Sequence, residues 1–221
     1  MIQSFIVLGT DTGVGKTVIT SFFLRYFLEK GINAVSQKWI QTGVQSHQSD
    51  IDFHDQFSGF NGNNSKDRCP YVFQFPSSPH LAAQRESILI NASVIKSSYN
   101  RLCNQYSMII VEGTGGIMVP YSSTGLVSDW VTEWNIPVVL VIGNQLGCIN
   151  HTLLSLDYLK NSQITLKGLI FSCPHQTNLD ILDDNVSIIS SKSDVPVLAN
   201  IPHGDDMDSL YTLFKNQMDH G

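Results

Sequence analysis

The chain has 221 residues, of which 42% are hydrophobic and 14% are charged, and its formal net charge at pH 7 is −6. This length and apolar content predict one folded domain with a buried core and exclude a disordered chain. The negative charge excludes a general nucleic-acid-binding protein. No apolar run approaches the roughly 18 residues that a membrane span needs, and no charged leader with an apolar stretch opens the sequence. We therefore expect a cytoplasmic protein without membrane or nucleic-acid partners.

Short apolar runs alternate with segments of helical pattern along the chain. We expect strands at 4–9, 33–38, 107–113, 136–143, 166–172 and 194–202. Several of these runs are continuous in Val, Ile and Leu, as in strands that are buried on both faces of a parallel sheet. We expect helices at 16–30, 91–104, 126–135, 147–161 and 206–218. The alternation predicts an α/β fold of P-loop type, with an open, mostly parallel sheet flanked by helices, in a single domain over residues 1–221.

Residues 43–80 interrupt this alternation. They contain the Gly- and Asn-rich stretch "GFNGNNSKDRCP" and, before it, "SDIDFHDQF", for which we predict a short helix with Ser49 as its N-cap. Ligands of open α/β sheets bind at the carboxyl ends of the strands. We therefore expect substrate loops within residues 40–80 and 114–128.

The sequence contains no recognisable zinc or redox motif. Its four cysteines are too far apart for a zinc knuckle or a CxxC pair, and we expect reduced thiols. The segment "SHQSDIDFHDQF" combines His and Asp residues, but their spacing matches no standard zinc pattern. We therefore predict loop and helix-surface positions for His47 and His54.

The stretch "GTDTGVGKT" at residues 9–17 lies between the first predicted strand and the first predicted helix, and we call it the phosphate loop. Gly13 and Gly15 allow a tight turn that points backbone N–H groups inward. Lys16 can reach the β- and γ-phosphates of a nucleotide, and Thr17 offers a hydroxyl to Mg²⁺. The positive N-terminal end of the helix that follows favours the same anion. The loop is one residue longer than the strict pattern.

Two charged residues end other predicted strands. Glu112 begins "EGTGG" at the end of a buried run, where an acidic residue can hold Mg²⁺ directly or through water. Lys38 is expected at the same sheet edge as the phosphate loop, where a lysine can stabilise a transferring phosphoryl group. A carboxylate of the segment 49–55 can complete a Mg²⁺ site with Thr17 and Glu112.

Residues 144–154, "NQLGCINHTLL", are expected to form a loop that turns into a helix. The N-terminus of such a helix offers backbone N–H groups to a carboxylate. No motif supplies a partner base for Cys148, so we do not expect this cysteine to act as a nucleophile.

The chain resembles the dethiobiotin synthase family, whose members use ATP to close the ureido ring in biotin biosynthesis. The phosphate loop is shared with many relatives, whereas the later stretches are more specific, and together they run in family order over nearly the whole chain. The matching stretches are "GTDTGVGKT" (9–17), "QKWIQTG" (37–43), "SD" (49–50), "SSPHLAAQ" (77–84), "VEGTGG" (111–116), "SDWVTEWNIPVVLVIG" (128–143) and "LGCINH" (146–151).

The resemblance implies a role for each matching residue. Contact with ATP is implied for Gly13, Val14, Gly15, Lys16, Thr17, Val18, Asp50, Glu112, Gly113, Thr114, Gly115, Ser172, Pro202, His203 and Gly204. Contact with the diamine substrate is implied for Thr12, Lys38, Thr42, Gly147, Cys148, Ile149 and Asn150, the last four across a homodimer interface. Mg²⁺ is expected at Thr17, Asp50 and Glu112, and Lys38 and Lys16 are expected to be catalytic.

The chain departs from the family pattern at three positions. Trp39 follows Lys38 where the family usually has proline, and Thr114 stands where it often has alanine. Ser172 replaces an asparagine that reads the nucleotide base, and a hydroxyl cannot form the paired hydrogen bonds of an amide. The segment "NIPHGDD" matches the family's other base-side turn.

Three other functions share parts of this pattern. A partition-type P-loop ATPase switch carries a signature lysine five residues before the loop lysine, where this chain has Asp11. A GTP-binding regulator requires an Asn-Lys-x-Asp run after a late strand, where this chain has "FSCPH". A catalytically silent relative remains the third alternative, although the expected catalytic and metal-binding side chains are all present.

Overall fold

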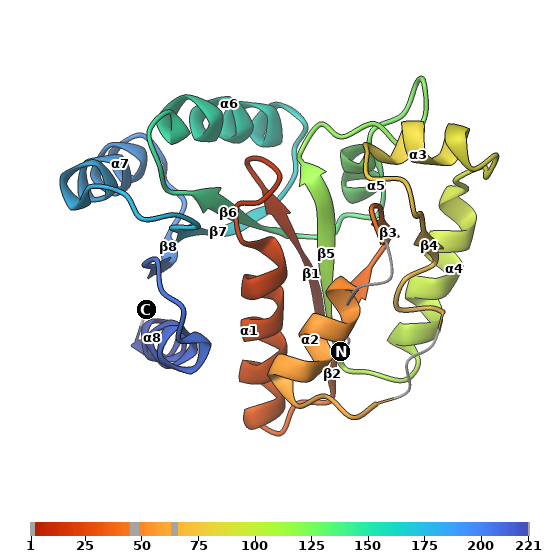
Figure 1. Cartoon of the computed structure of the whole chain (residues 1–221), viewed down its shortest axis with the longest axis horizontal. Coiled ribbons are helices and arrows are strands. Elements are labelled where there is room, and N and C mark those ends of the chain that lie inside the picture. Colours follow the sequence, from red (N-terminus) through yellow and green to blue (C-terminus); the bar gives the residue numbers. More distant parts are fainter. Residues whose placement is uncertain (1–2, 45–48, 63–65, 221) are drawn as a thin grey trace.

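A parallel sheet of six strands forms the centre of the computed structural model, which describes residues 3–44, 49–62 and 66–220 (Figure 1). The strands lie in the order β2-β5-β1-β6-β7-β8. Their bounds are β1 Gln3–Gly9, β2 Ala34–Lys38, β5 Met108–Gly116, β6 Val138–Gly143, β7 Leu166–Ser172 and β8 Val197–Ile201. All pairings within this sheet are parallel. This confirms the predicted α/β fold with an open parallel sheet.

Helices cover both faces of the sheet. The helices in the described part of the chain are α1 Lys16–Glu29, α2 Asp50–Ser58, α3 Pro79–Arg85, α4 Ala92–Cys103, α5 Val127–Glu133, α6 Cys148–Asn161, α7 Leu179–Ser191 and α8 Met207–His220. One apolar core joins α1 and α8 to the sheet, and the other joins α4, α5, α6 and α7 to its opposite face. None of these helices is long and apolar enough to cross a membrane.

Each strand and helix that the sequence predicts is present, with ends that shift by a few residues. Ser49 caps α2 as predicted, since its hydroxyl accepts a hydrogen bond from Asp52 N and the Asp52 carboxylate accepts one from Ser49 N. The sequence did not predict α3, α7 or the short parallel pair of β3 (Ile40–Gln41) and β4 (Tyr71–Val72).

The sheet register brings the chemically important residues together. Glu112 on β5 is paired with Val7 on β1 and with Lys38 on β2. The carboxyl ends of β1 and β5 point to the same edge, where the loop before α1 lies (Figure 1). Parallel strands therefore deliver the phosphate loop, Glu112 and Lys38 to one place.

Candidate active site

The phosphate loop turns sharply between β1 and α1. Gly13 and Gly15 have φ values of 71° and 97°, a left-handed backbone that side chains other than glycine rarely adopt. Gly15 is the N-cap of α1, and Lys16 and Thr17 form the start of the helix. The N-terminal end of α1 therefore faces the same cavity as the loop glycines, which suits a phosphate group.

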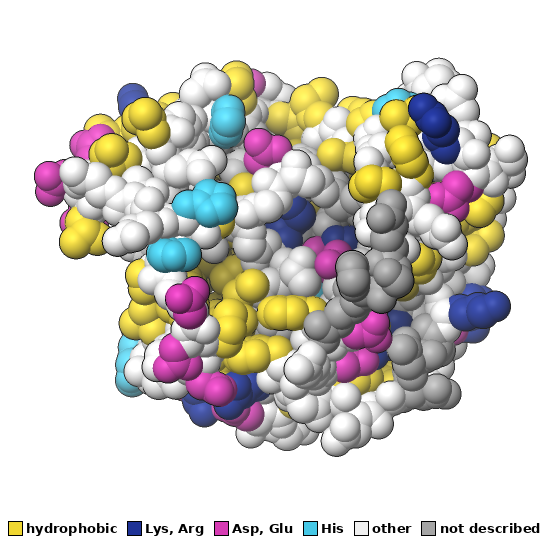
Figure 2. Space-filling view, viewed as in Figure 1, with side chains coloured by type: hydrophobic (Ala, Val, Ile, Leu, Met, Phe, Trp, Pro, Cys, Tyr) yellow, Lys and Arg dark blue, Asp and Glu magenta, His cyan; other side chains and the backbone are white. Residues whose placement is uncertain are grey.

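A cavity of about 400 Å³ lies beside this loop, and Figure 2 shows it as a hollow with basic and acidic side chains at its floor. It brings together residues of the phosphate loop, of the segment after β2, of α2 and of β5. The lining residues are Thr12, Gly13, Gly15, Lys16, Thr17, Val18, Lys38, Gln41, Thr42, Asp50, Glu112, Thr114 and Gly115. Most of the residues expected to meet ATP phosphates, Mg²⁺ and the diamine are among them. Val14, within the loop, is buried and does not line the cavity.

Lys38 lies between two carboxylates in this cavity. Its Nζ is 2.5 Å from Glu112 Oε1 and 2.7 Å from Asp50 Oδ2, and it also donates to Gly113 O. Burial would lower the pKa of Lys38, but the carboxylates of Glu112 and Asp50 raise it above its ordinary value. Burial would raise the pKa of Glu112, but the Lys38 ammonium and a hydrogen bond from His54 lower it to about 2. Lys38 is therefore a permanent cation within the site.

Lys16 is the second buried ammonium of the site. Its Nζ donates to Asp11 O at 2.7 Å, and the residue is 6% exposed. Burial and the nearby Lys38 charge lower the pKa of Lys16 to about 8. An anionic phosphate in the cavity would offset both effects, because it favours the charged ammonium.

The oxygen atoms expected to hold Mg²⁺ converge. Thr17 Oγ1 donates to Glu112 Oε1 at 3.0 Å, and Asp50 lines the same cavity. Mg²⁺ prefers a few protein oxygens completed by phosphate and water. Within the described residues no group of three or more His, Cys, Asp and Glu side chains is suited to hold a metal ion by itself. The donor set therefore fits Mg²⁺ that arrives with a nucleotide.

Trp39 secures the strand end that carries Lys38. Its side chain is 1% exposed, donates from Nε1 to Gln37 Oε1 at 3.1 Å, and meets Trp130 and Trp134 in edge-on ring contacts. Trp39 packs against Trp130 of α5, while Lys38 reaches Asp50 of α2.

The prediction of a surface position for His54 is wrong, and His47 lies outside the described residues. His54 is completely buried, and its Nε2 lies 2.8 Å from Glu112 Oε2. Ile51 and His54 are the buried residues of α2, and their spacing of three places both on the helix face that packs toward the sheet. Gln41 was also not anticipated: it lines the cavity, and its Oε1 accepts from Asp50 N at 3.3 Å.

The residues expected on the base side lie at the neighbouring strand ends. Ser172 ends β7 and is 7% exposed, next to the phosphate loop. Pro202, His203 and Gly204 follow β8 and are exposed. The pairing of Ser172 with Ile201 places this turn beside Ser172.

The segment Gly147, Cys148, Ile149 and Asn150 does not join the Lys38 cavity of the same chain. Gly147 is the N-cap of α6, and Cys148 is buried. Gly147, Ile149 and Asn150 line a separate cavity of about 690 Å³ between the starts of α6 and α7.

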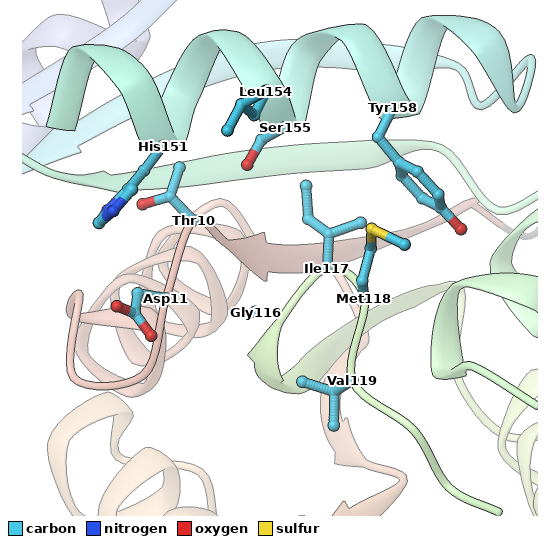
Figure 3. A pocket seen from close by; sticks show the side chains of 10 residues that line it. All are labelled: Thr10, Asp11, Gly116, Ile117, Met118, Val119, His151, Leu154, Ser155 and Tyr158. Carbon is cyan, nitrogen blue, oxygen red and sulfur yellow. The ribbon is translucent and has the colours of Figure 1, made fainter. Parts of the chain in front are cut away.

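A further cavity of about 420 Å³ separates the phosphate loop from α6. Figure 3 shows Thr10 and Asp11 on one side, the end of β5 and the residues that follow it (116–119) below, and His151 and Ser155 of α6 above. Exposed apolar side chains stand at its rim, since Met118 is 59% and Leu154 is 63% exposed.

Replacing Gly15 with Ala is expected to lower ATP affinity at least tenfold and to destabilise the fold by about 1–3 kcal/mol through backbone strain. The added Cβ would lie 2.5 Å from Ser172 Oγ, at a φ of +97°. Gly31→Ala is a matched control because its φ is +72° and nothing lies within 4 Å of the added carbon. Calorimetric titration and urea unfolding test both variants. Equal ATP affinity in the two variants would contradict the expected collision.

Comparisons with known proteins identify the family of the chain. A family model described as an AAA domain matches residues 3–209. An ATP-dependent dethiobiotin synthetase of Haemophilus influenzae is 38% identical over 167 residues, which cover 74% of this chain and 87% of that protein. Another of the same description, from Halalkalibacterium halodurans, is 32% identical over 220 residues, which cover 95% of this chain and 88% of that protein.

Solved structures show how widely the fold is shared. The MinD cell division protein of Aquifex aeolicus aligns with a TM-score of 0.58 at 12% identity, over 99% of this chain and 96% of that chain. Cobyrinic acid a,c-diamide synthase of Mycobacterium smegmatis, with bound ADP and magnesium, aligns with a TM-score of 0.55 at 14% identity, over 99% of this chain and 93% of that chain. These likenesses show the fold alone, whereas the sequence identities show the family. The chain belongs to the AAA-domain family and to the family of ATP-dependent dethiobiotin synthetases.

Proposed function

We propose that this protein uses ATP and Mg²⁺ to close the ureido ring of dethiobiotin from 7,8-diaminononanoate and CO₂. The observation that carries this proposal is the position of Lys38. The Lys38 ammonium contacts Asp50 and Glu112 in the cavity that the phosphate loop also lines. Together with the membership of the chain in this family, that position supports the proposed reaction. We further propose that the whole chain acts as one catalytic domain, with substrate loops within residues 40–80 and 114–128.

The nucleotide binds along the phosphate loop. Backbone N–H groups at the start of α1 and the Lys16 ammonium hold the phosphates, and Thr17, Asp50 and Glu112 hold Mg²⁺. When bound there, Mg²⁺ would supply positive charge against the phosphates. Ser172 and the turn Pro202–Gly204 contact the base. The remaining ATP contacts come from Val14, Val18 and the segment Gly113–Gly115.

The reaction requires positioning and charge neutralisation more than covalent help from the protein. One amine of the diamine adds to CO₂ and forms a carbamate. A carbamate oxygen attacks the γ-phosphate, and ADP leaves. The second amine then attacks the carbamate carbon, the ring closes, and phosphate leaves. Lys38 stabilises the carbamate and the transferring phosphoryl group, while Thr12 and Thr42 orient the diamine.

The carboxylate of the diamine is held by a second copy of the chain. Gly147, Cys148, Ile149 and Asn150 open α6, and their backbone N–H groups suit an anion. They lie in a different cavity from Lys38 of the same chain. A homodimer that brings α6 of one copy to the Lys38 cavity of the other would complete the site.

Replacing Leu154 with Asp is expected to dissociate this dimer and to reduce dethiobiotin formation at least tenfold. Leu154 is 63% exposed on α6, at the rim of the cavity of Figure 3, and a charge there would be desolvated in an interface. Leu89→Asp is the matched control because Leu89 is 84% exposed and lies outside the cavities described above. Light scattering and product formation are measured for both. A wild-type monomer at assay concentration would overturn the shared site.

The decisive comparison with a partition-type ATPase switch is phosphate release from Mg²⁺-ATP and bicarbonate, with and without 7,8-diaminononanoate. The proposed enzyme releases phosphate when the diamine is present, and CTP and GTP in parallel rank the base preference at Ser172. A switch would hydrolyse ATP without the diamine. ATP and bicarbonate are supplied in the cytoplasm, which is where we place the reaction.

A further inference from the structure

The carboxylate of Glu112 divides its two oxygens between the cavity and the protein interior. Oε1 accepts from Lys38 Nζ at 2.5 Å and from Thr17 Oγ1 at 3.0 Å, and both of these donors line the cavity. Oε2 accepts from Nε2 of His54 at 2.8 Å, on the side away from the cavity. A carboxylate whose inner oxygen is held in this way keeps its outer oxygen in one orientation.

Ser36 and Glu112 contact the two ring nitrogens of His54. Ser36 Oγ lies 3.0 Å from His54 Nδ1 and 2.9 Å from Arg68 Nη2. Arginine has only donors, so the serine oxygen accepts from Arg68, and its one proton can be donated to Nδ1. The ionised Glu112 carboxylate can only accept, so Nε2 carries a proton and donates it to Glu112.

Arg68 is fixed in turn. Its guanidinium is fully buried, forms hydrogen bonds of 2.6 Å with each carboxylate oxygen of Asp55, and donates from Nε to Ser36 O. The ring of Phe60 lies 4.5 Å from the guanidinium carbon. Since Asp55 follows His54 on α2, these contacts tie α2 to β2 and the imidazole to Glu112 on β5.

Stability alone does not explain this set of polar groups. Burying charged and polar side chains costs desolvation, and well-packed apolar side chains often replace them with no loss of stability. Apolar side chains in place of the whole set would fill the space between α2 and the sheet without that cost. The hydrogen bonds from Arg68 through Ser36 and His54 instead end on the Glu112 carboxylate, which lines the cavity. These polar groups therefore act on the site.

We propose that His54, held by Ser36, Arg68 and Asp55, is a positioning residue that fixes Glu112 so that Oε1 faces the phosphate and metal side of the cavity. This inference rests on the proposed function for the reaction that the site serves. The positioning role itself concerns only how Glu112 faces the nucleotide and the metal. Partners that orient a metal ligand typically contribute a factor of about 10–100 to metal affinity.

The test is Mn²⁺ binding to the protein–ADP complex, measured by electron paramagnetic resonance for His54→Gln and His54→Asn. The glutamine amide can take the place of Nε2 and donate to Glu112, whereas the shorter asparagine cannot reach it. We expect the Gln variant to keep the affinity within about threefold and the Asn variant to lose about 10–100-fold. Glutamine and asparagine both carry a polar amide, so burying the side chain at position 54 costs a similar desolvation free energy in the two variants.

Phe57→Ala is the control for general loosening of α2. Phe57 lies on the same helix and packs on Phe22 and Tyr211. We expect it to lower the urea midpoint without changing Mn²⁺ affinity. Equal Mn²⁺ affinity in the Gln and Asn variants, or an equal loss in Phe57→Ala, would overturn the positioning role. ADP affinity in the presence of a chelator is expected to stay constant in all three variants.

The outcome is separable from the proposed function, because the Mn²⁺ titration contains no diamine. A wild-type protein that forms no dethiobiotin would overturn the proposed function. The difference in Mn²⁺ affinity between His54→Gln and His54→Asn would still test the positioning role. Dethiobiotin formation with identical Mn²⁺ affinities would overturn the positioning role alone.

Discussion

Replacing Lys38 with Gln is expected to lower kcat for dethiobiotin formation by about 10²- to 10³-fold, as the loss of one charge-stabilising donor in an active site typically does. The amide keeps most of the side-chain volume but has no charge to set against the carbamate and the transferring phosphoryl group. ATP affinity is expected to change little because the phosphate loop is untouched. Product formation and a calorimetric ATP titration separate the two effects.

Stability is the necessary control for this variant. Removing one partner of a buried ion pair typically costs about 3–5 kcal/mol, and Lys38 is 5% exposed between two carboxylates. Thermal unfolding is therefore measured with and without Mg²⁺, and kcat is compared below the unfolding range. Lys192→Gln, at an exposed position, controls for the change of net charge. A folded Lys38→Gln protein with near-normal kcat would remove Lys38 from the mechanism.

Replacing Lys16 with Gln is expected to weaken ATP binding about 10–100-fold, since hydrogen bonds to charged groups contribute about 1.5–3 kcal/mol. In the ligand-free protein the pKa of Lys16 is about 8, and bound phosphates raise it. Below pH 8 the ammonium is already charged, so affinity is flat. Above pH 8 binding takes up a proton, and affinity falls by up to about tenfold per pH unit.

Calorimetry in two buffers of different ionisation enthalpy measures that proton. Wild-type protein is expected to take up close to one proton per ATP well above pH 8, and Lys16→Gln is expected to take up none. The Lys192→Gln protein serves again as the control and should match wild type. The same proton uptake in the Lys16→Gln protein would assign the titration to another group.

Local sequence signals located most of the site because parallel strands bring their carboxyl ends together. The buried apolar runs of β1, β2 and β5 were recognisable, and their parallel order aligns Lys38 with Glu112. Local chemistry also located the Ser49 cap of α2. By contrast, α7 was missed, since Asp and Asn dilute its pattern and its buried face consists of Leu182, Asn185 and Ile189.

The buried hydrogen-bond network around Glu112 could not be predicted from the sequence for a different reason. Which face of the short helix α2 turns inward depends on its packing against α1 and β2. The signal that was available was the spacing of Ile51 and His54, which places an imidazole on an apolar helix face. Arg68 comes from the segment that precedes β4, and no local pattern connects it with Ser36 or Asp55.

The most direct test of the proposed reaction uses ¹³C-labelled bicarbonate with purified protein, Mg²⁺-ATP and 7,8-diaminononanoate. Mass spectrometry follows the product, and phosphate release is counted in the same samples. The account predicts dethiobiotin with one ¹³C in its ureido carbon and one phosphate released for each molecule formed. Phosphate release without a labelled ring, or at a rate that ignores the diamine, would contradict it.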